Sequence, residues 1–171
     1  MKPKIIIIAF SVFLLFAGLF LLGYVEKGGN MASVQGVGGS HPARGQLVAS
    51  ELSYDFGTIS MKNGNVQKEF TITNSTSEDI NLKTVVTSCM CTQAFIVRPD
   101  GSTEGPFGMP GMGYVPPAND VIKAGESRVI RAVYDPNAHG PAGVGQINRF
   151  ITLTDASGGT LELEIKALVK P

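Results

Sequence analysis

The sequence predicts an all-β protein, an immunoglobulin-like antiparallel β-sandwich of about seven strands. Beyond residue 46 the chain consists of short segments in which apolar and polar residues alternate, and no amphipathic helical pattern separates them. The 171 residues include 21 glycines and 10 prolines, which indicates many turns. Short strands joined by turns, without crossover helices, favour an antiparallel sandwich over an α/β fold.

The strongest strand pattern lies near the end of the chain. Residues 161–167 read LELEIKA, so that every second side chain is apolar and the others are charged. Asn63-Gly64 and residues 156–159 are predicted turns, and the sequon Asn74-Ser75-Thr76 is also interpreted as a turn. Further strands are predicted at residues 47–53, 66–74, 80–88, 128–134 and 149–154.

Residues 5–25 are apolar except for Ser11 and carry no charge. As a helix this segment would be about 31 Å long, which matches the hydrocarbon core of a bilayer. Lys2 and Lys4 precede it, and the positive-inside bias places the N-terminus in the cytoplasm and the remainder outside. We therefore expect residues 1–27 to be an uncleaved single-pass membrane anchor. A cleaved secretory signal is the alternative.

Residues 28–45 are rich in glycine and serine and have no apolar period, which is typical of a flexible linker. The domain itself is expected to cover residues 46–171, a length sufficient for one hydrophobic core and too short for two. The expected location of this domain is the extracytoplasmic face of the cell membrane.

Composition limits the possible functions. Lysine plus arginine and aspartate plus glutamate both total 14, so the formal net charge is zero and gives no electrostatic reason to expect nucleic acid as a partner. The sequence has no paired acid and base near a histidine, no nucleophile elbow and no phosphate-binding loop before a helix. We therefore expect that the protein is not an enzyme.

The only cysteines form the motif Cys89-Met90-Cys91 at the end of a predicted strand. On an extended strand their Cα atoms would lie about 6.5–7 Å apart, at the limit for a disulfide, so a bridge needs a local turn and would be strained and easily reduced. Two thiols on one face are also soft metal ligands. A structural disulfide, free thiols, a metal site and a thiol–disulfide exchange site all stay open.

His139 lies in the predicted loop 135–140, which a sandwich topology places at the same end as the cysteines. Met109 and Met112 lie in the long Met-, Gly- and Pro-rich loop 105–114, and their thioethers could complete a Cu(I) site with Cys89, Cys91 and His139. Zinc fits less well, because it usually takes four ligands. Alternatively, His139 is a turn residue and the methionines form an exposed apolar surface for a partner.

Several segments, in order along the chain, resemble the bacterial domain-of-unknown-function family 1573. The most similar is Thr87-Ser88-Cys89-Met90-Cys91-Thr92, where the family usually has glycine between the cysteines. The resemblance implies a PapD-like or Hydin-like immunoglobulin sandwich outside the cytoplasm with no established activity. Met90 and the longer stretch 98–126 depart from the family pattern. The other similar segments are residues 54–59, 70–74, 124–126 and 134–136.

Three functional hypotheses follow. The first is a non-enzymatic binding or structural module of the cell envelope with a protein partner. The second is binding of Cu(I) or another soft metal through the Cys-x-Cys motif, with histidine and methionine. The third is thiol–disulfide exchange at Cys89 and Cys91, which requires a nearby cation or a helix N-terminus to stabilise a thiolate. Neither feature is recognisable in the sequence.

Overall fold

The structure of the protein is a computed structural model that describes residues 46–171. The predicted membrane anchor (1–27) and linker (28–45) lie outside the described residues. Within the described part of the chain, no helix is long and apolar enough to cross a membrane.

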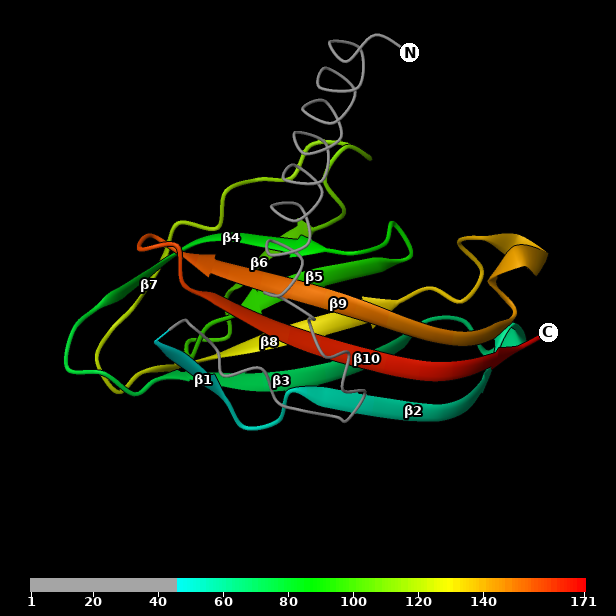
Figure 1. The fold of residues 1–171 in the computed structure, drawn as a ribbon, viewed down its shortest axis with the longest axis horizontal. Helices are drawn as coiled ribbons and strands as arrows, with labels where there is room; N and C mark the ends of the chain where they lie inside the picture. Colours follow the sequence, from blue (N-terminus) through cyan, green and yellow to red (C-terminus); the bar gives the residue numbers. More distant parts are fainter. Residues whose placement is uncertain (1–45) are drawn as a thin grey trace, which may run out of the picture. The chain divides into compact units, whose positions relative to one another are not determined.

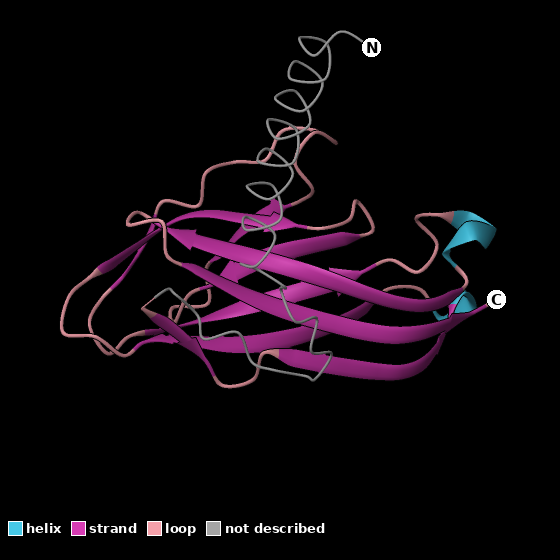
Figure 2. Cartoon of the chain, in the orientation of Figure 1, coloured by secondary structure: helices cyan, strands magenta, loops and turns pink. Residues whose placement is uncertain are grey.

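Residues 46–171 form two five-stranded β-sheets that pack as two layers (Figures 1 and 2). All strand pairs are antiparallel except β2 and β10, which are parallel. Two short 3-10 helices, η2 (Met61–Asn63) and η3 (Gly140–Gly143), lie in loops. The first sheet has the order β1 (Leu47–Ala49), β3 (Val66–Asn74), β8 (Ser127–Tyr134), β5 (Thr92–Val97) and β6 (Thr103–Phe107). The second has the order β2 (Ser53–Ser60), β10 (Thr160–Lys170), β9 (Gly145–Asp155), β4 (Ile80–Thr87) and β7 (Asp120–Ile122).

The predicted all-β sandwich is confirmed, but the expected number of about seven strands is too low, because the two sheets contain ten strands in the described residues. Strand β2 has no fully buried residue, so its sequence does not show a clear alternation of buried and exposed positions. Strands β6 and β7 are three to five residues long and lie within the stretch 98–126, and β6 overlaps the segment 105–114 that the sequence suggested was a loop. Runs this short contain too few residues for a recognisable period of two.

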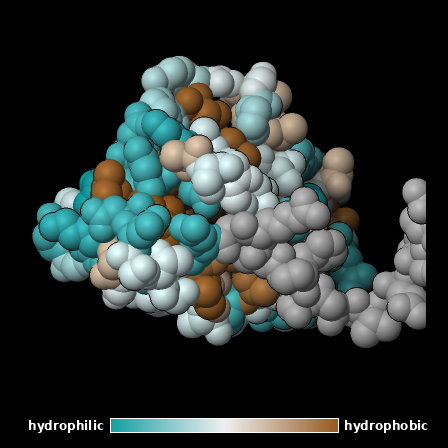
Figure 3. All heavy atoms as spheres, turned by 60° about the vertical axis from the view of Figure 1, so that its left-hand side comes forward, coloured by the Kyte–Doolittle hydropathy of each residue, from teal (hydrophilic) through white to brown (hydrophobic). Residues whose placement is uncertain are grey.

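The core lies between the two sheets and follows the predicted alternation. In β10, residues 161, 163, 165, 167 and 169 are buried, and the intervening residues face outward or are partly covered. Phe70 and Ile72 of β3 are fully buried in the opposite layer. Each such side chain contributes about 1.5–3 kcal/mol relative to an exposed one. The face seen in Figure 3 carries separate small apolar patches among polar residues, as is usual for a folded domain.

Asn74 at the end of β3 is fully buried, which agrees with the interpretation of its sequon as a turn. Its Nδ2 donates hydrogen bonds to the carbonyl oxygens of Glu78 at 2.7 Å and Ile122 at 2.9 Å, and its Oδ1 accepts from Thr76 N at 3.0 Å. The side chain therefore ties the β3–β4 connection to β7.

Replacing Asn74 with alanine should destabilise the domain by about 1–2 kcal/mol, because the substitution leaves buried carbonyl and amide groups without partners. Urea unfolding of the full chain measures this change. The exposed Asn65, for which the matched Asn65→Ala change should stay within about 0.5 kcal/mol, serves as the control. Equal stabilities of the two variants would contradict the role assigned to Asn74.

A buried ion pair connects the two sheets. Asp120 of β7 is 4% exposed and Arg128 of β8 is 5% exposed, and Asp120 Oδ2 lies 2.7 Å from Arg128 Nε. The other carboxylate oxygen accepts from Arg98 Nε at 2.9 Å, and this hydrogen bond raises the pKa of Arg98 above its ordinary value. Arg128 also donates to the carbonyl of Val121 at 2.9 Å. The Asp120 carboxylate thus links β7 to Arg128 of β8 and to Arg98, the residue that follows β5.

Strand register determines which residues share an end of the sandwich. Leu47 of β1 is paired with Asn74 at one end of the first sheet. At the opposite end Tyr134 is paired with both Val66 and Thr92. The cysteine motif directly precedes Thr92, so it lies at the end opposite to Leu47.

Candidate functional site

The two cysteines lie in a tight turn between β4 and β5. Cys89 is two residues beyond the end of β4, and Cys91 is four residues beyond it. β4 ends at Thr87, earlier than the predicted strand 80–88. The backbone N–H of Thr92 donates to the carbonyl of Cys89 at 3.1 Å and closes the turn. Thr87 Oγ1 lies 3.0 Å from the carbonyl oxygens of both Cys89 and Thr92. The buried Thr87 hydroxyl therefore holds the two sides of the turn together.

Cys89 and Cys91 are joined by a disulfide bond, with an S–S distance of 2.08 Å and a Cα–Cα distance of 5.2 Å. The turn brings the two Cα atoms closer than the about 6.5–7 Å of an extended strand, which is the local change that a bridge requires. Of the alternatives that the sequence left open, the bridged form is the one in this structure. Cys89 is 8% exposed and Cys91 is 2% exposed.

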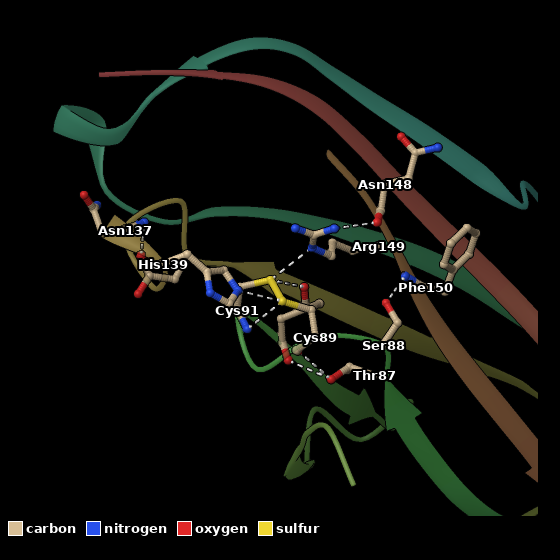
Figure 4. The surroundings of a disulfide bond; sticks show 11 residues. Thr87, Ser88, Cys89, Cys91, Asn137, His139, Asn148, Arg149 and Phe150 are labelled. Atoms are coloured by element: carbon tan, nitrogen blue, oxygen red, sulfur yellow. Dashed lines mark hydrogen bonds between the residues drawn. A yellow bond between two sulfur atoms is a disulfide. The ribbon is translucent and has the colours of Figure 1, made fainter. Parts of the chain in front are cut away.

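His139 lies beside the disulfide, as the sandwich topology predicted. It comes from the loop between β8 and β9, immediately before η3, and its side chain is exposed. His139 Nε2 is 3.1 Å from Cys89 Sγ, and Figure 4 shows the imidazole directed at the sulfur pair. We call Cys89, Met90, Cys91, His139 and Arg149 the sulfur tip.

Arg149, the fifth residue of β9, is the member of the sulfur tip that the sequence did not reveal. Its Nε donates a hydrogen bond to Cys91 Sγ at 3.1 Å, and its Nη1 donates to the carbonyl of Asn148 at 2.9 Å (Figure 4). None of the ion pairs within residues 46–171 involves Arg149. The guanidinium charge therefore acts on the disulfide and its surroundings without a carboxylate to neutralise it.

The signal that could have identified Arg149 is topological. The strand that contains it follows the loop of His139, so its first residues must lie at the same end of the sandwich as that histidine. Residues 149–154 are predicted as a strand, and only the loop of His139 was expected at the cysteine end. The nearby cation that a thiolate requires is thus present, 58 positions from Cys91 along the chain.

The turn itself supplies a second N–H donor beside that of Arg149, since the backbone N–H of Cys91 donates to Cys89 Sγ at 3.2 Å. Nitrogen atoms therefore lie close to both sulfur atoms. The His139 imidazole and the backbone N–H of Cys91 contact Cys89 Sγ, and the Arg149 guanidinium contacts Cys91 Sγ. A disulfide sulfur is a weak acceptor, whereas a thiolate is a charged one that such donors stabilise. The arrangement is better matched to the reduced cysteines than to the disulfide.

Tyr134 and Asp135 support the turn from β8. Tyr134 is buried, and its burial raises the pKa of its phenol above the ordinary value, while the nearby charge of Arg149 acts in the opposite direction. The backbone N–H of Asp135 donates to the carbonyl of Cys91 at 2.9 Å. The second cysteine is therefore fixed to the sheet through its backbone.

The predicted ligands Met109 and Met112 lie next to the sulfur tip but are not among its nearest groups. The long loop reaches β4, because Thr87 N donates to the carbonyl of Gly108 at 3.1 Å. Both methionines line a shallow pocket with Met90, which is 48% exposed, and neither cysteine lines this pocket. The potential metal ligands that the structure brings together are Cys89, Cys91 and His139, whose ligand atoms all lie within 4.8 Å of one another. Any role of the methionines as ligands stays a prediction.

Taken together, these features define an immunoglobulin-like β-sandwich domain with a disulfide-bonded Cys-x-Cys turn at one end. Residues 47–99 match the family described as "Protein of unknown function (DUF1573)", which confirms the resemblance that the sequence motifs indicated. The matched segment contains the cysteines, whereas His139 and Arg149 lie beyond it. A comparison with curated proteins found no match.

Solved structures with similar folds are distant in sequence. A protein of unknown function from Porphyromonas gingivalis W83 is 18% identical with a TM-score of 0.51, over 71% of this chain and 46% of that protein, which supports the fold alone. The chain thus spans less than half of that protein. Human CEP192 PapD-like domain 7 is 12% identical with a TM-score of 0.46, over 83% of this chain and 98% of that domain. The periplasmic chaperone SfaE is 10% identical with a TM-score of 0.41, over 73% of this chain and 58% of that chain.

Proposed function

We propose that this chain is a membrane-anchored, extracytoplasmic module of the cell envelope that engages a protein partner by thiol–disulfide exchange at the sulfur tip. The observation that supports this function best is the approach of nitrogen groups to both sulfur atoms of the Cys89–Cys91 disulfide. The N–H groups of Arg149 and of the turn backbone donate hydrogen bonds, and the imidazole of His139 lies beside Cys89. The sequence favoured a binding module because of the sandwich fold, the linker and the lack of catalytic groups, and it revealed no cation near the cysteines that could support thiol exchange. Arg149 removes that objection.

The donors act on the balance between disulfide and dithiol. Hydrogen bonds to charged groups are roughly twice as strong as those between neutral groups, so the donors stabilise a thiolate more than a disulfide sulfur. Stabilising the reduced form raises the reduction potential and makes the disulfide a better oxidant. The sulfur tip therefore favours uptake of electrons from a partner.

The exchange begins at Cys89, the more accessible of the two cysteines. A thiolate of the partner attacks Cys89 Sγ, the Cys89–Cys91 bond breaks, and Cys91 leaves as a thiolate hydrogen-bonded to Arg149. A second thiol of the partner, as its thiolate, then attacks the partner's own sulfur in the mixed disulfide and releases Cys89 as a thiolate near His139. The partner dithiol becomes a disulfide, and the two electrons reside on Cys89 and Cys91. Reoxidation requires a second disulfide-bearing protein.

The proposed partner is a protein that reacts stoichiometrically, and the chain is not an enzyme acting on a small molecule. Met90, Met109 and Met112 line the shallow pocket beside the turn and offer adaptable apolar contacts for a polypeptide. The proposed location follows from the apolar segment 5–25. Protease added to intact spheroplasts tests it, because residues 46–171 should be degraded, and full protection would contradict this topology.

The redox proposal is tested by equilibrating the full chain in detergent with glutathione buffers and counting the alkylated thiols by mass spectrometry. We expect half-reduction between about −120 and −270 mV, the range of exchange-active disulfides. A disulfide that stays intact in buffers poised below about −300 mV would be structural and would contradict the proposal. The Cys89→Ser/Cys91→Ser variant gives the alkylation background.

A further inference from the structure

We infer that the reduced sulfur tip binds one Cu(I) ion through Cys89 Sγ, Cys91 Sγ and His139 Nε2. This inference concerns the dithiol state of the site proposed above and adds a metal ion as its ligand. Formation of the disulfide removes both thiolates, so oxidation and metal binding exclude each other. The ion would be held only while the cysteines are reduced.

The distances suit a single ion. Metal–ligand bonds of about 2.0–2.3 Å place the ligand atoms of one ion within about 4.6 Å of each other. The three ligand atoms here lie within 4.8 Å of one another while the sulfurs are still bonded together, so a small rearrangement brings them within this limit. On reduction the two sulfurs can separate toward the distance that a shared ion requires. The 5.2 Å between the Cα atoms leaves room for this small separation.

The ligand types favour a soft ion. Two thiolates and an imidazole are ligands for which soft metals compete well. Structural zinc sites are almost always four-coordinate, whereas three suitable side chains meet at this position in the described residues. The thioethers of Met90, Met109 and Met112 line the adjoining pocket and are not among these three ligands.

The charge of Arg149 favours a monovalent ion. Two thiolates and a neutral imidazole around Cu(I) carry one net negative charge, and binding releases the two thiol protons. The guanidinium at 3.1 Å from Cys91 Sγ neutralises that charge. The same ligands around a divalent ion are already neutral, so Arg149 would leave an excess positive charge in a partly buried position. The preference for Cu(I) over Zn²⁺ therefore follows from both ligand type and electrostatics.

The test is an anaerobic titration of the fully reduced full chain in detergent with Cu(I), in competition with a chromogenic Cu(I) chelator. We expect one equivalent to bind. Affinity should fall by about 10-fold or more in His139→Ala, a substitution in an exposed loop, and still further in Cys89→Ser/Cys91→Ser. The Met109→Leu/Met112→Leu variant is the matched control and should keep the wild-type affinity.

Several outcomes would overturn the inference. These are the absence of Cu(I) uptake by the reduced wild-type protein, unchanged affinity in the cysteine double variant, or a loss in the methionine variant without a loss in His139→Ala. Tighter binding of Zn²⁺ than of Cu(I) would also contradict it. Because the titration starts from chemically reduced protein, its result does not depend on the reduction potential. Failure of metal binding and failure of thiol exchange are thus distinguishable.

Discussion

Replacing Asp120 with alanine is expected to destabilise the domain by about 3–5 kcal/mol, because removing one partner of a buried ion pair leaves a buried charge uncompensated. Arg128 is 5% exposed and has Asp120 as its closest carboxylate, at 2.7 Å. Its remaining acidic neighbour, Glu126, lies 3.1 Å away and is partly exposed, so it can replace little of the lost interaction. Arg98 loses its 2.9 Å contact at the same time.

Urea unfolding of the full chain in a mild detergent measures this loss. The matched control is Glu69→Ala, which removes the partner of Arg131 in an ion pair on the sheet surface at 2.9 Å. Exposed pairs of this kind contribute at most about 1 kcal/mol. A loss of similar size in both variants would show that the Asp120 carboxylate does not hold the two sheets together. Asp120→Asn keeps the shape and should still destabilise, since it removes the charge that both arginines require.

Replacing Arg149 with glutamine is expected to lower the reduction potential of the Cys89–Cys91 pair by about 30–60 mV. This range corresponds to the loss of a charge-assisted hydrogen bond of about 1.5–3 kcal/mol to the Cys91 thiolate. The direction follows from the charge: without the guanidinium the thiolate is less stable and the disulfide is harder to reduce. Equilibration with glutathione buffers, followed by alkylation, measures the shift.

Arg131→Gln provides the matched control, because Arg131 is a half-exposed arginine on β8 that is paired with Glu69 and makes no contact with sulfur. The reduction potential of the Cys89–Cys91 pair in the Arg131→Gln variant should equal that of the wild type. Arg149→Lys should retain part of the effect, since an ammonium keeps the charge but lacks the planar donors of a guanidinium. An unchanged potential in Arg149→Gln would mean that the contact with Cys91 Sγ does not stabilise the thiolate.

The elements that the sequence predicts well are those whose partners are local. The alternation in residues 161–167 depends only on which face of one strand is buried, and β10 has that pattern. Strand β7 could not be predicted in this way, because it begins with a charged residue, Asp120, and charged residues are typical of loops. The buried Asp120 is paired with Arg98, which follows β5, and with Arg128 of β8, and no local pattern in the sequence contains that information.

The candidate site shows the same division. Cys89 and Cys91 are two residues apart in the motif, and the sandwich topology was sufficient to predict His139 beside them. Arg149 was missed because its position depends on where β9 begins after η3, a boundary that the sequence does not define. The loop with Met109 and Met112 reaches the neighbourhood of the motif, but its methionines face a separate pocket.

The register of β1 has a practical consequence. Leu47 is opposite Asn74, whereas the disulfide lies at the Val66 end of β3, so nine residues of that strand, roughly 26 Å, separate the two. Any support to which the domain is attached through residue 46 therefore holds it by the end remote from the disulfide. Immobilisation through that residue on a sensor chip leaves the far end unobstructed for a reactant arriving from solution.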